Sequence, residues 1–271
     1  MNNPFLKKTE INGIKNIIVV ASGKGGVGKS TIAAGIALSL AKEGYATGLL
    51  DADIYGPSIP VLFNTGTDKP HGVEIEGKQK IVPLERLGLK IMSVGFFIDP
   101  KQALQWRGPI ASNTLKQLME ETLWGNLDYL IIDTPPGTGD IHLTILQTYN
   151  INGVFIVTTP QLMAQSDVQK AISMFSGQEI GAPILGIIEN MSWFSPIAKP
   201  EERYELFGKG GGKALAEEFN IPLIAQVPIT ENTCQLCDQG KVHEILNVPS
   251  IKLAFQSINQ CIASSLLVNT N

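Results

Sequence analysis

Cysteine is scarce in this sequence, with three residues in a chain of 271. So few thiols exclude a fold held together by a disulfide framework. The first ten residues contain no apolar signal core, and no apolar run reaches the length of about 18 residues that a membrane-spanning helix needs. We therefore expect a cytoplasmic protein with no membrane partner.

Basic charge is also limited. The 21 Lys and Arg residues are outnumbered by 25 Asp and Glu residues, and they form no run. Nucleic-acid-binding proteins carry a basic patch, so we expect no nucleic-acid partner. Hydrophobic residues make up 44% of the chain, which is enough for a buried sheet covered by helices on both faces.

Short apolar runs alternate with helical patterns along the chain. The predicted strands are residues 16–21, 46–50, 89–94, 128–132, 153–158, 183–188 and 223–227. The predicted helices are residues 29–43, 110–122, 141–148, 165–175, 213–219 and 251–266. Repeated βα units rich in Ile, Val and Leu predict an α/β fold with a doubly wound, mostly parallel sheet and helices on both faces. We expect one domain over residues 1–271, in which residues 1–15 are a short N-terminal extension.

Two stretches interrupt this alternation. Residues 54–87 are rich in Gly and Pro and end in a predicted small hairpin, and residues 192–212 form a second long loop. Loops of this length are usually functional or mobile. We expect residues 193–207 to move with the neighbouring nucleotide site.

The strongest motif is a glycine-rich octet between a predicted strand and a predicted helix. It fits the pattern G-x-x-x-x-G-K-S, in which backbone N–H groups surround phosphates, Lys29 contacts the outer phosphates and Ser30 holds Mg²⁺. The expected nucleotide-binding residues here are Gly23, Lys24, Gly25, Gly26, Val27, Gly28, Lys29, Ser30 and Thr31.

Lys24 adds a second lysine to this loop. The sequence K-G-G-V-G-K-S resembles the deviant Walker A motif of MinD, ParA and nitrogenase iron-protein relatives. The resemblance implies that Lys24 reaches across a homodimer to the partner's nucleotide and takes part in catalysis. A solvated surface lysine is the alternative reading.

Three aspartates end predicted strands. Asp133 closes a buried strand, a position suited to holding Mg²⁺ through water. Asp53 is the candidate that orients the attacking water, and Asp51 supports the metal or the loop. One of the last two is alternatively only a turn-forming residue.

The motifs together resemble the Mrp/ApbC family of P-loop ATPases. The resemblance rests on residues 22–30, 51–58, 106–109, 124–140 and 189–192, in family order. It implies a Mg-dependent ATP hydrolase that carries iron-sulfur clusters to recipient apoproteins, works with other iron-sulfur assembly proteins and forms a homodimer. It also implies that Asn190 lies against the adenine and Arg107 near the subunit or switch region. For Asn190, a turn position after a strand is the alternative.

The sequence departs from this family in two places. Many members have a small extra N-terminal domain, which we expect to be absent. Many also place a C-x-x-C pair after the segment 189–192, whereas this chain has Ser195 and Ala198 in that region. Neither side chain offers the thiolate that an iron-sulfur cluster requires.

A different C-x-x-C pair occurs at Cys234 and Cys237. On a helix, residues i and i+3 share a face, and a symmetric dimer would supply four thiols to one bridging cluster. His243 could add a nitrogen ligand. The alternative is two small hydrophobic residues on a helix. Cys261 is expected in core packing, and His71 and His142 have no metal-ligand spacing.

Two other functions fit parts of the sequence. The first is a MinD-like or ParA-like switch that dimerises with ATP. The second is a partner-binding regulator without a cluster of its own, which the missing thiols keep open.

Overall fold

A computed structural model describes residues 8–97, 108–161, 165–177, 181–196 and 198–267. Within them, one eight-stranded sheet has the order β10-β9-β8-β1-β7-β2-β6-β5. Its strands are β1 (Ile14–Ser22), β2 (Thr47–Asp51), β5 (Leu84–Arg86), β6 (Leu89–Ser93), β7 (Leu127–Asp133), β8 (Gly153–Thr158), β9 (Ile184–Ser195) and β10 (Leu223–Thr230). Every strand pair in this sheet is parallel except β5 with β6, so the predicted fold class is confirmed.

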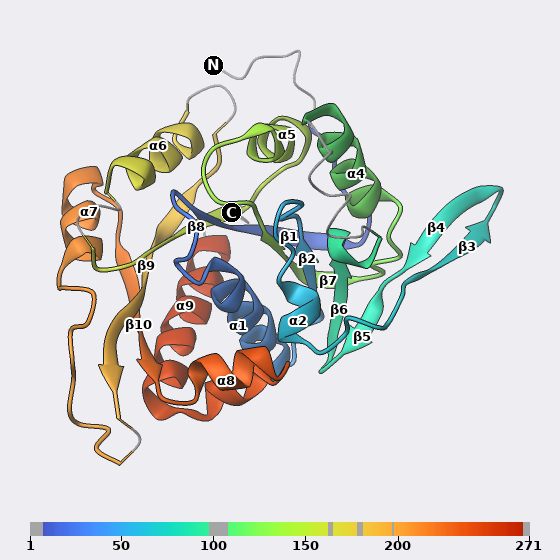
Figure 1. The fold of residues 1–271 in the computed structure, drawn as a ribbon. Coiled ribbons are helices and arrows are strands. Elements are labelled where there is room, and N and C mark those ends of the chain that lie inside the picture. Colours follow the sequence, from blue (N-terminus) through green and yellow to red (C-terminus); the bar gives the residue numbers. More distant parts are fainter. Residues whose placement is uncertain (1–7, 98–107, 162–164, 178–180, 197, 268–271) are drawn as a thin grey trace.

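The buried stretches of the central strands consist mainly of Ile, Val and Leu because helices cover both faces of the sheet. One layer contains α1 (Lys29–Lys42) and α9 (Pro249–Leu267). The other contains α4 (Gly108–Glu120), α5 (Asp140–Thr148), α6 (Gln165–Phe175) and α7 (Gly211–Phe219) (Figure 1). Shorter helical elements are α2 (Ile59–Leu62), η1 (Val94–Phe96), α8 (Thr233–Asp238) and η3 (Val242–Asn247).

Helices α1 and α9 approach closely at one glycine. A Cβ atom at Gly35 would lie 2.2 Å from the ring of Phe255. Only glycine leaves room for this ring, so the aromatic side chain of α9 can rest on the backbone of α1. This contact fixes the helix that begins at the phosphate-binding loop.

The predicted hairpin is present as β3 (His71–Ile75) and β4 (Lys78–Val82). Glu76 and Gly77 turn the chain with φ angles of 51° and 75°, as a tight two-residue hairpin turn requires. The hairpin projects from the edge of the molecule (Figure 1).

Strand β9 is longer than the sequence predicted, and residues 192–195 belong to it rather than to a loop. It continues because β10 pairs with it as far as Ser195. The backbones of Phe194 and Tyr204 also exchange two hydrogen bonds of 2.8 and 2.9 Å. Met191, with a φ of 57°, marks an irregularity after the predicted strand end.

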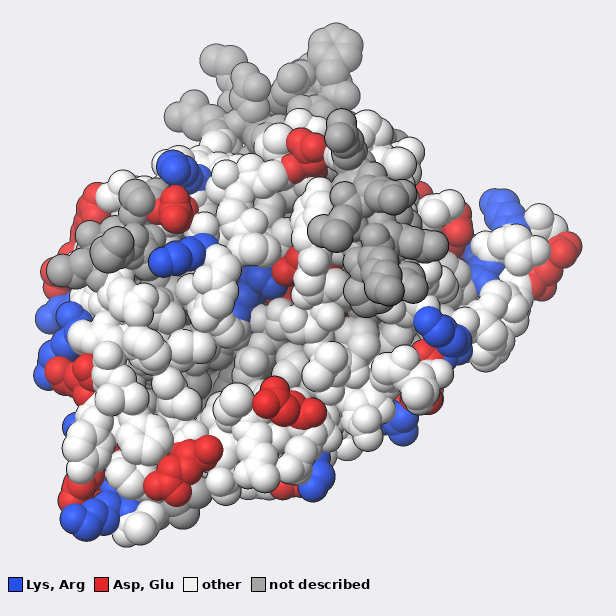
Figure 2. Space-filling model, viewed as in Figure 1, with Lys and Arg blue, Asp and Glu red and all other residues white. Residues whose placement is uncertain are grey.

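The surface carries charge of both signs. On the face shown in Figure 2, acidic and basic side chains are interspersed along the margin, and a basic side chain lies beside acidic ones in the central hollow. Within the described ranges, none of the helices combines the length and the hydropathy needed to cross a bilayer.

Candidate nucleotide-binding site

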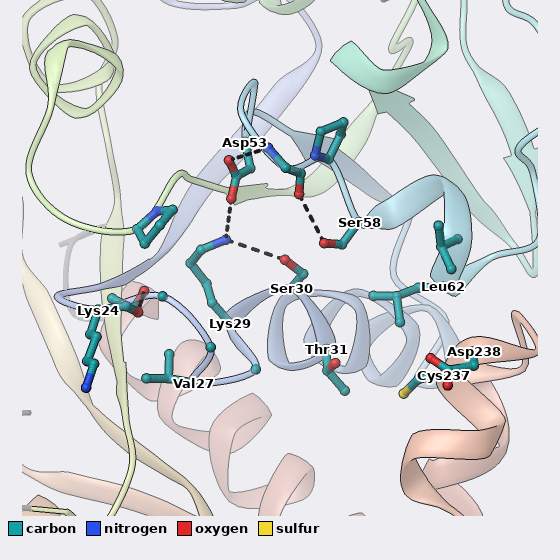
Figure 3. A pocket seen from close by; sticks show the side chains of 18 residues that line it. Lys24, Val27, Lys29, Ser30, Thr31, Asp53, Ser58, Leu62, Cys237 and Asp238 are labelled. Atoms are coloured by element: carbon teal, nitrogen blue, oxygen red, sulfur yellow. Dashed lines mark hydrogen bonds and ion pairs between the residues drawn. The ribbon is translucent and has the colours of Figure 1, made fainter. Parts of the chain in front are cut away.

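The predicted phosphate-binding loop, residues 23–28, connects β1 to α1, and Lys29, Ser30 and Thr31 form the first turn of α1. Gly26 and Gly28 have φ angles of 80° and 77°, a left-handed conformation that glycine adopts without strain. The loop borders a cavity of about 540 Å³ (Figure 3). The other walls are formed by Asp53, Gly56, Pro57, Ser58, Val61, Leu62, Pro136, Cys237 and Asp238.

Lys29 connects the predicted catalytic and metal-binding residues. Its side chain is buried, and its Nζ lies 2.6 Å from Oδ1 of Asp133 and 3.8 Å from Oδ2 of Asp53. The Nζ is also 3.5 Å from Oγ of Ser30. The structure therefore brings Asp53 and Asp133, which are distant in the sequence, to the adjacent residues Lys29 and Ser30. Figure 3 shows Lys29 between Asp53 and Ser30.

One carboxylate oxygen of Asp133 has no hydrogen-bond partner. Its side chain is fully buried, yet Oδ2 makes no hydrogen bond. Burial raises the pKa of Asp133, and the nearby ammonium of Lys29 opposes that rise. An unpartnered buried carboxylate oxygen beside the Ser30 hydroxyl is a donor set suited to Mg²⁺, which prefers oxygen ligands.

Asp51 is occupied by the loop that follows it. Its Oδ1 accepts from the N–H of Asp53 at 3.1 Å, and its Oδ2 accepts from Ile59 N at 3.1 Å and Ser93 Oγ at 2.9 Å. Burial, followed by the charge of Asp133, raises the pKa of Asp51 to about 8. Asp51 was predicted to support either the metal or the loop. These hydrogen bonds favour the second role, in which Asp51 holds the loop in place.

Asp53 faces the cavity from this loop. Its Oδ1 accepts from Gly56 N at 3.2 Å, which leaves Oδ2 directed towards Lys29. Burial raises the pKa of Asp53, although the charge of Lys29 works in the opposite direction. A partly desolvated carboxylate at the cavity wall is placed to contact a water molecule there.

Lys24 and Asn190 occupy different positions around the loop. Lys24 is exposed, and its side chain points away from Lys29 (Figure 3). Asn190 is buried on β9, and its Nδ2 donates to the carbonyl of Val27 at 2.8 Å. A Cβ atom at Gly28 would lie 2.3 Å from that Nδ2, so the amide and the loop fit together only because residue 28 is glycine.

His142 is a site residue that the sequence did not reveal. The hydroxyl of Thr134 donates to Val20 O, so Nε2 of His142 must donate to Thr134 Oγ1 at 3.1 Å. Its Nδ1 then accepts from Gly139 N at 3.3 Å. The imidazole therefore links both ends of the loop that follows Asp133. Burial, with a contribution from Lys29, lowers the pKa of His142 to about 4, which keeps the ring neutral.

Glu189 is a second residue that sequence analysis did not single out. It is buried beside Asn190, and Oε2 accepts from Gly212 N at 2.7 Å. Its Oε1 accepts from Gln226 Nε2 at 2.7 Å and from Ser192 Oγ at 2.9 Å. This carboxylate holds β9, β10 and the start of α7 together. The sequence pointed to Glu189 only through its place in the family-like segment Glu189-Asn-Met-Ser.

The cysteines of the C-x-x-C pair lie on α8, as the helix prediction required. Cys237 lines the nucleotide cavity, whereas Cys234 is exposed. No three His, Cys, Asp or Glu side chains of the described residues gather as metal ligands, so His243 on η3 does not join the pair within one chain. At the other expected thiol position, Ser195 donates to the carbonyls of Pro200 and Glu202. Arg107 lies outside the described residues.

Comparison with known proteins agrees with this geometry. The ParA family profile described as "NUBPL iron-transfer P-loop NTPase" matches residues 13–263. The chain is 42% identical to the iron-sulfur cluster carrier protein of Aquifex aeolicus over 94% of this chain and 69% of that protein. It is 47% identical to the protein of the same name from Rickettsia bellii, over 88% of this chain and 69% of the relative.

Solved structures give the same picture. A nucleotide-binding protein from Archaeoglobus fulgidus in complex with ADP has 39% identity and a TM-score of 0.75, covering 90% of this chain and 93% of its own. The cell division ATPase MinD of Pyrococcus furiosus has a TM-score of 0.65 at 19% identity, covering 92% and 98%, and shares the fold. The chain belongs to the NUBPL iron-transfer P-loop NTPase family.

Proposed function

We propose that this chain is a Mg-dependent ATPase that acts as a homodimeric iron-sulfur cluster carrier. The main support for the proposal is that Lys29 forms ion pairs with Asp133 and Asp53 beside the cavity that the phosphate-binding loop borders. Relatives at 42–47% identity are named iron-sulfur cluster carrier proteins, which supports the cargo. We assign residues 1–271 to one ATPase domain and the protein to the cytoplasm.

Each residue of the site has a role in this proposal. Ser30 and Asp133 would hold Mg²⁺, which supplies positive charge against the phosphates when bound. Lys29 leaves Asp133 and contacts the outer phosphates, while Asp53 orients the attacking water. Asp51 fixes the loop that carries Asp53, because three donors of that loop and β6 hold its carboxylate.

Lys24 and Asn190 complete the nucleotide site. Lys24 is exposed and turned away from its own Lys29, which leaves it free to reach a nucleotide bound by a second copy. There it would stabilise charge that develops on the transferred phosphate. Asn190 would contact the adenine after its hydrogen bond with Val27 is exchanged for one with the base.

The first test is ATP turnover in Lys29→Ala compared with Lys42→Ala. Both lysines lie on α1, but Lys42 is exposed at the far end of the helix. We expect Lys29→Ala to lose turnover by at least about a hundredfold, since it removes the charge facing the phosphates, and Lys42→Ala to keep it. Full turnover in Lys29→Ala would refute the site assignment.

The cargo is tested separately by anaerobic reconstitution with iron and sulfide. The candidate ligands are Cys234 and Cys237, two from each protomer, and recipient apoproteins and other iron-sulfur assembly proteins are the expected partners. We expect visible absorption in the wild type and its loss in a Cys234→Ala/Cys237→Ala variant. Cys261→Ala serves as the control, since that thiol lies against the carbonyl of Leu185.

A second candidate function is an ATP-dependent dimerisation switch or partner-binding regulator without its own cluster. It is favoured by Ser195, whose hydroxyl proton is shared between two carbonyls at a position where many family members have a thiol. Turnover with no absorption in any reconstituted sample would select this candidate.

A further inference from the structure

The C-x-x-C helix lies against the nucleotide site rather than apart from it. Helix α8 contacts α2, and a Cβ atom at Gly240 would lie 2.4 Å from Asn64, which shows how closely the two segments meet. Cys237 and Asp238 form part of the wall of the same cavity that the phosphate-binding loop borders. Figure 3 shows both beside Thr31 and Leu62.

The two thiols of the pair have different surroundings. Cys237 is half-buried, and burial raises the pKa of its thiol, while a hydrogen bond with Thr31 opposes that rise. Thr31 belongs to the first turn of α1, directly after Lys29 and Ser30. Cys234 is exposed, and its Sγ lies 3.6 Å from Oδ2 of Asp238. One thiol therefore faces the nucleotide cavity and the other faces solvent.

We propose that the thiol pair and the nucleotide cavity form one coupled site, in which a ligand on Sγ of Cys237 and a bound nucleotide exclude each other. The ligand class is a thiol-seeking one: a soft metal centre held by Cys234 and Cys237, or an electrophile that attaches to Cys237. The metal form rests on the proposed cluster function, whereas the exclusion itself rests on the cavity alone.

Two features make the coupling antagonistic. A group attached to Sγ of Cys237 would occupy cavity volume beside Thr31, next to the phosphate-binding loop. The carboxylate of Asp238 already lines that wall, so a thiolate ligand set adds negative charge near the phosphates. Coupling between two binding equilibria is reciprocal, so nucleotide weakens the thiol ligand by the same factor.

Alkylation with N-ethylmaleimide tests the exclusion without ATP turnover or a cluster. The thiol adds across the maleimide double bond, so that an S–C bond forms and the thiol proton moves to the neighbouring carbon. We expect saturating MgADP to slow modification of Cys237 by at least about tenfold and that of Cys234 by less than about twofold, read by peptide mass spectrometry. Cys234 is an internal control on the same helix.

The reciprocal measurement is ADP affinity by titration calorimetry before and after alkylation. In Cys234→Ala/Cys261→Ala, modification of Cys237 is expected to weaken ADP binding at least about tenfold. In Cys237→Ala/Cys261→Ala, modification of Cys234 is expected to change it less than about twofold. Equal ADP affinity before and after modification of Cys237, or equal protection of both thiols, would overturn the proposal.

These outcomes are separable from those of the proposed function. If ADP binds and protects Cys237, but the protein neither hydrolyses ATP nor takes up iron, the coupled site is supported and the carrier function is refuted. If the protein hydrolyses ATP, but Cys237 reacts equally fast with and without MgADP, the ATPase function is supported and the coupled site is refuted.

Discussion

Lys29 is a buried lysine at the wall of the nucleotide cavity. Its ammonium lies between two carboxylates, at 2.6 Å from Asp133 and 3.8 Å from Asp53. These contacts place two carboxyl side chains around one lysine. Phosphates would withdraw Lys29 from them, and the excess negative charge would then favour a divalent cation.

His142 predicts a pH dependence of stability. The folded-state pKa of about 4 lies below the value of about 6.5 for an unfolded histidine, so between these values the unfolded chain binds more protons. The free energy of unfolding therefore falls as the pH drops from about 6.5 towards 4. Between pH 7 and pH 5 the contribution is about 2 kcal/mol.

His142→Asn should remove this contribution while keeping an acceptor for Gly139 N. The free energy of unfolding is measured in urea at pH 7 and pH 5 for both proteins. We expect the variant to lose about 2 kcal/mol less than the wild type over that interval, although it is less stable at pH 7. The same loss in both proteins would show that His142 is not the group responsible.

The sequence predicted those site residues that lie next to one another in the chain. The octet from Gly23 to Ser30 is contiguous, so its spacing alone predicted the loop and its lysine. The role of His142 depends on how the loop between Thr134 and Gly139 folds back on the ring, which spacing does not encode. For the same reason the sequence left two roles for Asp51, and the hydrogen bonds of the folded loop favour one of them.

Among the elements, β9 differs most from its prediction. The aliphatic run 183–188 predicted its first half, which pairs with β8. The second half contains Asn, Ser and Trp, and it is a strand because of distant partners in β10 and at Tyr204. Non-local pairing of this kind leaves no periodic pattern in the sequence. The site residue Asn190 lies at the junction of the two halves.

Glu189 should be the main anchor of this strand. Glu189→Gln replaces one acceptor oxygen by an NH2 group that cannot accept, so the buried donors Gly212 N and Ser192 Oγ no longer each have a side-chain oxygen to bond. We expect a loss of about 1–3 kcal/mol in the free energy of unfolding. Chemical denaturation measures it.

The matched control for this substitution is Glu217→Gln on α7. Glu217 is exposed and pairs only with Lys213 across one helical turn, so its loss should change stability little. Equal effects of the two substitutions would argue against the anchoring role of Glu189.

For the whole molecule, the parallel sheet explains why distant residues share one cavity. The phosphate-binding loop, Asp53 and the loop after Asp133 all follow the carboxyl ends of neighbouring strands β1, β2 and β7. Ligands of such sheets bind at that edge. The parallel sheet was predictable from the βα rhythm, whereas the order of its strands was not. The position of α8 beside the cavity was not predictable either, because it follows from contacts between short helices.

Assembly should depend on nucleotide and on Lys24. With Mg²⁺ and a slowly hydrolysed ATP analogue, we expect the molar mass from light scattering to double. Lys24→Ala should remain at the monomer mass, since it loses the charge that would contact the partner's nucleotide. Lys15→Ala is the control, because that exposed lysine pairs with Asp128 at the other end of β1. A dimer of unchanged stability in Lys24→Ala would contradict the role across the interface.

The β3–β4 hairpin has a practical consequence. Its turn at Glu76 and Gly77 lies at the tip of a hairpin that projects from the molecule (Figure 1), and a Cβ atom at Gly77 would touch nothing within 4 Å. The ribbon can therefore be lengthened at its tip without disturbing the sheet. An affinity tag or a fluorescent reporter inserted between these two residues would follow the protein through loading and delivery while both chain ends stay native.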